Sequence, residues 1–319
     1  MLRRFGIATA AAAWASLASA QTYPTHPIRL MVSYPPGGAA DIVARAVGTP
    51  LAARLGQPVV VENRPGSNGN LAGELVAAAA PDGHTLLLGP SALFGINPHL
   101  YAKMAIDPRK DLLPVASVVS NALILAIDPK LGPRDFRAFI DFARRAPSPL
   151  FYASIGNGSE HHLAMEMLKQ ASGIDLIHVP YKGGGPAALG VMAGDVAAMF
   201  GGGSASALVQ SGELRGVAVS GRTRSPLLPD LPAIAEFYPD YEVTLWQGLF
   251  APVGTRPEIV TRLRDELTAV LAQPDLVAKL AAAGAGDPFT TSQPDFAARI
   301  RADYERYGKV IKAIGLKVE

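Results

Sequence analysis

Four glycine-rich segments follow strand-like runs in this sequence, and each precedes a helical pattern. They are Pro35–Ala39, Ser154–Ser159, Tyr181–Pro186 and Phe200–Ser204. Unpaired backbone N–H groups at the start of a helix, together with the positive end of the helix dipole, attract anions. Any one segment is compatible with a simple tight turn, but four of them favour an anion site made of backbone amides. Pro35–Ala39 lacks the motifs of dinucleotide sites and P-loops, so nucleotide binding is disfavoured.

The side chains in these segments indicate catalysis or metal binding only weakly. Ser159 can cap the helix that begins after it, which is compatible with ligand contact. Ser159 and His162 lie three residues apart, but the chain has no G-x-S-x-G motif, so a hydrolase is the weaker hypothesis. His162 and Glu166 have the i, i+4 spacing of two metal ligands, yet a structural role is favoured and no metal or other cofactor is predicted. Because the chain has no Cys, thiol chemistry and disulfides are excluded.

The elements that must position these segments alternate along the chain. We expect strands at 28–33, 58–62 and 84–88 with helices between them, which is the β-α-β-α-β order of a parallel sheet. Pro50 interrupts the first helix, which should kink or restart there with Thr49 as its cap.

A second series of strands and helices follows. We expect strands at 112–119, 122–127, 151–154, 176–179, 196–200 and 214–219, and helices at 135–145, 159–171, 186–193 and 204–210. A strand at 243–250 and a helical tail complete the chain. Two α/β halves and a tail predict one domain from residues 21–118 plus 247–319 and another from 119–246. A ligand cleft should lie between them, where the glycine-rich segments converge.

The first 20 residues read as a secretory signal peptide. Arg3 and Arg4 precede an apolar run that ends in Ala18-Ser19-Ala20, so we expect cleavage before Gln21, and general secretion is favoured over twin-arginine export. Removing Arg3 and Arg4 lowers Lys+Arg from 29 to 27, equal to the 27 Asp+Glu. The remaining chain therefore has no positive field for nucleic acid, and we expect a soluble, exported protein without a nucleic-acid partner.

Longer segments of the chain carry a family resemblance. They are YPTHPIRLMVSYPPGGAADIVARAV, VVVENRPGSNGNLAGELVAAAAPDGHTLLLG, INPHLY, YASIGNGSEHHLAMEML, IHVPYKGGGPAALGVMAGDV, LRGVAVSGRTRSPLLPDLPAIAE and WQGLFAPVGT. In this order they closely resemble the receptors of tripartite tricarboxylate transporters, also called Bug-type periplasmic solute-binding proteins. The resemblance covers essentially the whole chain after the signal peptide.

The resemblance implies an α/β fold, a two-domain periplasmic-binding-protein clamshell of the type II kind with a sheet flanked by helices in each domain. It implies a periplasmic monomer, not an enzyme, that captures a small organic carboxylate and delivers it to membrane transporter subunits. Backbone amides and bridging waters would hold the ligand. The implied binding residues are Tyr34, Gly37, Gly38, Ala39, Asp41 and Ser91 in the first domain, and Ser154, Gly158, Ser159, His162, Tyr181 and Lys182 in the second.

Three questions stay open at this point. Many relatives carry a polar or acidic residue after the strand that ends here at Phe200, whereas this chain has Gly201-Gly202-Gly203, so the sequence does not name the carboxylate. A sensor that docks on a signalling partner is an alternative to a transport receptor. An exported hydrolase that uses Ser159 and His162 is a further alternative.

Overall fold

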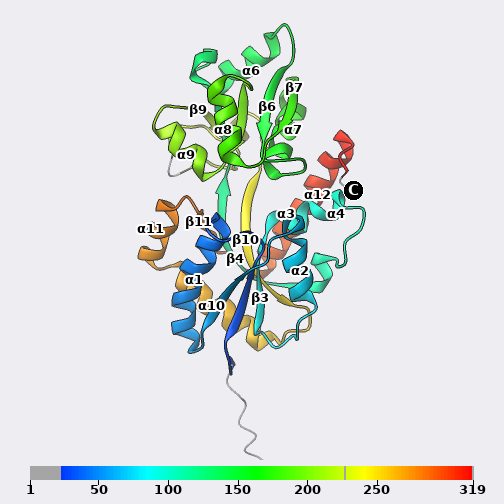
Figure 1. Cartoon of the computed structure of the whole chain (residues 1–319), viewed down its shortest axis with the longest axis vertical. Coiled ribbons are helices and arrows are strands. Elements are labelled where there is room, and N and C mark those ends of the chain that lie inside the picture. Colours follow the sequence, from blue (N-terminus) through cyan, green and yellow to red (C-terminus); the bar gives the residue numbers. More distant parts are fainter. Residues whose placement is uncertain (1–22, 226–227, 318–319) are drawn as a thin grey trace, which may run out of the picture.

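The computed structural model describes residues 23–225 and 228–317, which form two lobes, each built on its own β-sheet (Figure 1). The expected signal peptide and Gln21 lie outside the described residues. Among the described helices, none is both long and apolar enough to span a bilayer.

The sheet of the first lobe has six strands in the order β11-β4-β10-β3-β1-β2. β1 (Ile28–Val32) pairs in parallel with β2 (Val59–Asn63) and with β3 (Thr85–Pro90). The helices α1 (Ala39–Leu55) and α2 (Asn70–Ala77) connect them, which confirms the predicted β-α-β-α-β order. β1 and β3 are largely buried, as is usual for parallel strands that helices cover on both faces.

The first helix does not restart at Pro50. α1 is a single helix with Pro50 inside it, so the expected new start with Thr49 as cap is wrong. Val43, Val47 and Leu51 are buried on one face of α1 and pack into the first-lobe core on both sides of the proline. This burial holds both parts of the helix on the sheet, and it outweighs the hydrogen bond that Pro50 cannot donate.

Two long strands run between the lobes. β4 (Leu112–Ala122) and β10 (Thr244–Pro252) pair antiparallel along their whole length, and β10 also pairs antiparallel with β3. The short β11 (Asp287–Pro288) adds to the outer side of β4. In Figure 1 β4 and β10 extend from the first lobe toward the second. The predicted domain boundaries near residues 118 and 246 fall within these strands and stay a prediction.

The sheet of the second lobe has five strands in the order β7-β6-β8-β5-β9. β6 is parallel to β7 and β8, whereas β5 is antiparallel to β8 and β9. Its strands are β5 (Ile124–Ile127), β6 (Leu150–Ser154), β7 (Leu176–Pro180), β8 (Ala198–Gly201) and β9 (Arg215–Val219), and its helices are α6 (Phe136–Arg145), α7 (Glu160–Ser172), α8 (Gly184–Ala193) and α9 (Gly203–Gln210).

The remaining helices belong to the tail and to short connections. They are α3 (Ser91–Gly95), α4 (Asn97–Leu100), α5 (Pro108–Asp111), α10 (Pro257–Leu271), α11 (Pro274–Ala282) and α12 (Gln293–Ile314). α12 contacts both lobes. Phe296 and Ile300 pack with Trp246 of β10, whereas Tyr307 and Val310 pack in the same apolar core as residues of the second lobe.

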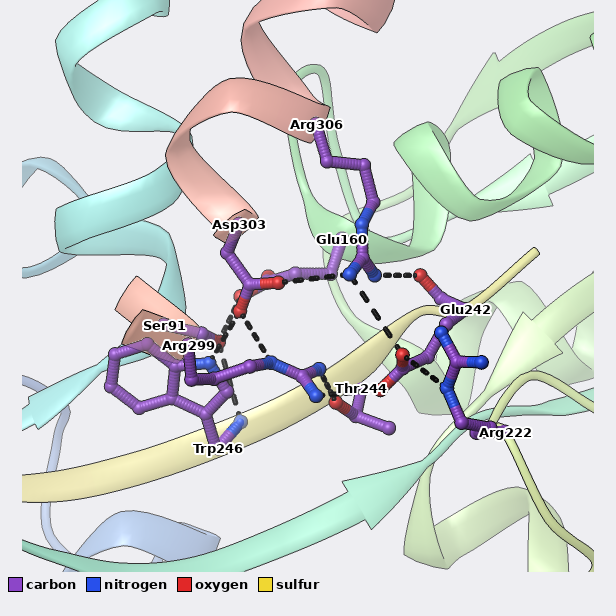
Figure 2. Close-up of polar contacts among 9 residues, drawn as sticks. All are labelled: Ser91, Glu160, Arg222, Glu242, Thr244, Trp246, Arg299, Asp303 and Arg306. Carbon is purple, nitrogen blue, oxygen red and sulfur yellow. Dashed lines mark hydrogen bonds and ion pairs between the residues drawn. The ribbon is translucent and has the colours of Figure 1, made fainter. Parts of the chain in front are cut away.

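A buried ionic cluster attaches α12 to the connection between the lobes (Figure 2). We call it the α12 cluster, and its members are Glu242, Thr244, Trp246, Arg299, Asp303 and Arg306. Asp303 is 0% exposed, and its Oδ2 accepts from the indole Nε1 of Trp246 at 2.7 Å and from Arg299 Nε at 3.1 Å. Arg299 also pairs with Glu242 at 2.6 Å. Burial opposes ionisation of Glu242, but Arg299, Arg306 and Arg222 hold its pKa below the ordinary value.

Candidate ligand-binding site

Loops from the two lobes meet where the strands β1, β3 and β6 end. Ser91, directly after β3, donates to Glu160 Oε1 at the start of α7 across 3.0 Å. A Cβ built on Gly158 of the second lobe would collide with the side chain of Leu100 of α4. The two contacts show that the glycine-rich end of β6 lies against residues that follow β3 of the first lobe.

Asp41 of α1 holds the first-lobe loop, Pro35–Ala39, in place. Gly37 has a φ of +82°, and its amide donates to Asp41 Oδ2 at 3.0 Å. Asp41 is 5% exposed and also accepts from Arg45 Nε and Asn63 Nδ2. Hydrogen bonds from Arg45 and from the Gly37 amide lower the pKa of Asp41 to about 2. Asp41 therefore stabilises the loop as a carboxylate whose oxygens are already bound within the lobe.

The outer side of this loop presents free backbone amides. Gly38 is the N-cap of α1 in an extended conformation, with φ −78° and ψ 168°. The amides of Ala39 and Ala40, at the start of the 17-residue helix, have no acceptor within the described residues. Gly37, Gly38 and Ala39 are exposed. An anion at this point would meet N–H groups and the positive end of the helix dipole.

A strained asparagine turn lies beside this loop, and the sequence analysis did not single it out. Ser67 and Asn68 are non-glycine residues with φ of 45° and 52°. Asn68 Nδ2 donates to Asn97 Oδ1 at 3.0 Å, and buried Asn97 donates to Asn70 Oδ1 at 2.6 Å. The Tyr34 hydroxyl reaches Asn68 Oδ1 at 3.5 Å. Strained backbone of this kind costs about 1–3 kcal/mol per residue and concentrates at functional sites.

Ser91 and Tyr34 lie beside the interlobe contact. Ser91 is 1% exposed, and while it donates to Glu160 its Oγ accepts from the backbone amide of Trp246 at 3.3 Å. Burial raises the pKa of Glu160, and burial followed by the nearby Glu160 raises that of Tyr34. Figure 2 shows Ser91 between Glu160 and Trp246. Ser91 thus joins the second lobe to the crossing strand β10.

In the second-lobe loop, four predicted residues form one hydrogen-bonded turn. Ser154 is 0% exposed, and its Oγ accepts from the Gly156 amide at 3.0 Å. Ser159 caps α7, accepting from the His162 amide at 3.3 Å and donating to the Gly156 carbonyl at 2.8 Å. The Gly158 amide donates to His162 Nδ1 at 3.1 Å. The Ser159 hydroxyl is therefore bound to backbone and not to the His162 ring.

The Tyr181 amide donates to the Ser154 carbonyl at 2.9 Å, but the structure does not bring the side chains of Tyr181 and Lys182 into this group. Tyr181 packs under α8 with its hydroxyl against Gly190, on the core side of its own lobe. Lys182 is exposed after β7. The fourth glycine segment lies elsewhere between the lobes: Gly203 packs on the backbone of Gly284, beside a cavity of about 210 Å³.

His162 and Glu166, for which the sequence favoured a structural role despite their spacing, are not part of a group of metal-type ligands among the described residues. A group with suitable spacing occurs instead at His26, Asp82 and His84. His84 Nε2 accepts from the Thr25 amide at 3.2 Å, so the proton of a neutral ring is on Nδ1, which lies 3.4 Å from Asp82 Oδ1. This arrangement is a hydrogen-bonded turn, in which the His84 amide also donates to Asp82 Oδ1 at 2.9 Å.

Comparison with known proteins shows the family of the chain. Residues 43–316 match the model of the tripartite tricarboxylate transporter family receptor, TctC. The chain belongs to this family. Protein BugT of Bordetella pertussis is 35% identical over 323 residues, covering 100% of this chain and 98% of BugT.

Solved structures agree with this assignment to the TctC family. A Rhodopseudomonas palustris protein solved with adipate has a TM-score of 0.79 and 33% identity, over 93% of this chain and 100% of that one. MatC of the same organism, with bound malate, has a TM-score of 0.74 and 30% identity, over 91% of this chain and 100% of MatC. The TctC family comprises periplasmic solute-binding proteins, so the predicted two-lobed α/β fold and the resemblance are confirmed.

Proposed function

We propose that this TctC-family protein captures a small organic carboxylate between its lobes and delivers it to membrane transporter subunits. The observation that carries the proposal is the pair of glycine-containing loops that follow β1 and β6. The first loop has free backbone amides at the start of α1, and the second is a hydrogen-bonded turn of the other lobe. Backbone amides suit a carboxylate because each charge-assisted bond contributes about 1.5–3 kcal/mol. Adipate and malate are the ligands of two relatives.

We assign ten of the twelve predicted residues to two roles. Gly37, Gly38, Ala39 and Tyr34 belong to the surface that meets the ligand. Asp41, Ser91, Ser154, Gly158, Ser159 and His162 hold that surface in place, because their polar atoms are bound within the protein. Tyr181 and Lys182 would contribute only if the end of β7 moved toward the first lobe. In this proposal the chain is exported, loses residues 1–20 and acts as a periplasmic monomer.

A thermal-shift screen tests the proposal. A carboxylate at 100 times its Kd should stabilise the fold by about 2.7 kcal/mol, or roughly 5 °C, by mass action. The panel is di- and tricarboxylates, acidic amino acids and aromatic acids, and the matched control for adipate is its diamide, which lacks the charge. If no acid shifts the melting temperature, or acid and amide act equally, the proposal is contradicted. Release of product from an ester would favour the hydrolase instead.

The fluorescence of Trp246 should report ligand-driven closure. Trp246 is 1% exposed, donates to Asp303 and is linked through Ser91 to Glu160 of the second lobe. The sequence has two Trp, and the other, Trp14, belongs to the expected signal peptide. We expect the emission of the processed protein to change on saturation with a carboxylate. Closure of the lobes would move the groups around Trp246, which lies on a strand that runs between them. Calorimetric saturation with unchanged emission would contradict this prediction, and unchanged small-angle scattering would contradict closure itself.

A further inference from the structure

Two imidazole rings are stacked behind the second-lobe loop. His162 of α7 and His178 of β7 have ring centroids 3.8 Å apart and planes inclined by 8°. His162 is 5% exposed, and the Tyr152 ring lies beside the pair, 5.1 Å from the His178 ring and 6.4 Å from the His162 ring. His178 was not among the residues singled out from the sequence.

Each ring holds one end of the loop. His162 Nδ1 accepts from the Gly158 amide at 3.1 Å, and His178 Nε2 lies 2.6 Å from Ser154 Oγ, which in turn accepts from the Gly156 amide at 3.0 Å. Gly156 and Gly158 have φ of +135° and +73°. The loop therefore keeps its conformation through glycine geometry and through these two rings.

The hydrogen bond from the Gly158 amide specifies the protonation state of His162 Nδ1. Because His162 Nδ1 accepts a backbone N–H, it carries no proton, and a proton there would place two donors against each other. The charged groups that face the rings are Glu166 and Lys169 of α7, with the Tyr152 hydroxyl of β6. Glu166 accepts from Tyr152 at 2.7 Å and pairs with Lys169 at 3.0 Å, so its charge is compensated.

We propose that His162 and His178 are positioning residues, which as a neutral stacked pair hold the 154–159 loop in its ligand-binding conformation and release it when protonated. The claim that this conformation binds ligand rests on the proposed function, whereas the claim that the two rings hold the loop does not. Burial lowers the pKa of both imidazoles, for His178 to about 4, with the nearby His162 adding to the effect. The unfolded or released rings titrate near 6.5, so acid favours release: the loop is held above about pH 6.5 and is progressively freed toward pH 4.

Hydrogen exchange of the ligand-free protein tests the holding of the loop. His162→Phe keeps a stacked ring but removes the acceptor, and His162→Asn restores an acceptor near the position of Nδ1. We expect the Gly158 amide to exchange at least tenfold faster in the Phe variant and to recover in the Asn variant, while the Leu30 amide of β1 is unaffected in both. Equal Gly158 protection in the wild type and the Phe variant would overturn the proposal.

The wild-type protein supplies a test that does not depend on any variant folding. The protection factor of the Gly158 amide, corrected for intrinsic exchange, should fall between pH 6.5 and pH 4, and NMR titration of the His162 and His178 rings should follow the same curve. A protection factor that stays constant while both rings titrate would overturn the release step.

Affinity for adipate and malate tests the ligand part. At pH 7.5 we expect His162→Phe to bind about tenfold more weakly and His162→Asn to bind like the wild type. Lost Gly158 protection with unchanged affinity would overturn the ligand part alone. If neither acid, nor any acid of the thermal-shift panel, binds the wild type, the proposed function fails, while the exchange result still decides whether the rings hold the loop.

Discussion

Gly38→Val is expected to fold like the wild type and to lose roughly 10- to 10⁴-fold in carboxylate affinity, because its side chain would stand between the ligand and the amides at the start of α1. Gly38 has a φ of −78°, which valine adopts without strain, and a Cβ built there meets only the Pro35 carbonyl, at 3.5 Å. Neither the backbone angle nor the available space therefore requires glycine at this position. Because glycine is preferred over valine at the N-cap of a helix, we expect a small loss of stability beside the loss of affinity.

Gly37 provides the contrasting control. Its φ of +82° belongs to the left-handed region, so Gly37→Ala should lose about 1–2 kcal/mol of stability. Calorimetric titration and urea unfolding of both variants separate the two roles. Near wild-type affinity in a folded Gly38→Val protein would remove this loop from the binding site.

Asp303→Ala is expected to lower the free energy of unfolding by about 3–5 kcal/mol, because it leaves buried partners without their acceptor. Asp303 is 0% exposed and accepts from the Trp246 indole and from Arg299, which also donates to Glu242 and Thr244. Removing the Asp303 carboxylate thus leaves Trp246 Nε1 without its acceptor. The arginines of the α12 cluster also lose one of the negative charges that they face.

A surface ion pair is the matched control for Asp303. Arg54 and Glu266 are 2.6 Å apart, but the arginine side chain is 42% exposed, so Arg54→Ala should change stability by less than about 1 kcal/mol. Urea unfolding followed by circular dichroism compares the two variants. Equal small effects would contradict the view that the α12 cluster contributes to stability.

Patterns that are local in the sequence predicted most of the fold. Strand-like runs bounded by glycine turns gave β1, β2 and β3 with their helices, because hydrophobic periodicity and turn residues act over short distances. Pro50 misled the prediction of α1, since its local cost is offset by burial against a sheet that the pattern does not show. The two-residue strand β11 has no pattern of its own and exists because β4 lies beside it.

The candidate site was predicted at its glycines but not at its partners. Gly37, Gly38 and Gly158 mark turns that the sequence shows directly. Nothing local indicates that Glu160 contacts Ser91, 69 residues away, because that pairing depends on how the lobes close. The contact of Asn68 with Asn97 spans 29 residues, and no local pattern indicates it either.

The order in which strands are shared between the lobes also bears on how the chain reaches its fold. Every strand of the second sheet comes from the continuous stretch between Ile124 and Val219, so that sheet can be completed without waiting for later residues. The first sheet cannot, because Leu88 of β3 pairs with Leu249 of β10. During synthesis from the N-terminus, β3 therefore keeps an unpaired edge until the whole second lobe has been made, and an unpaired strand edge is a site at which partly folded chains associate.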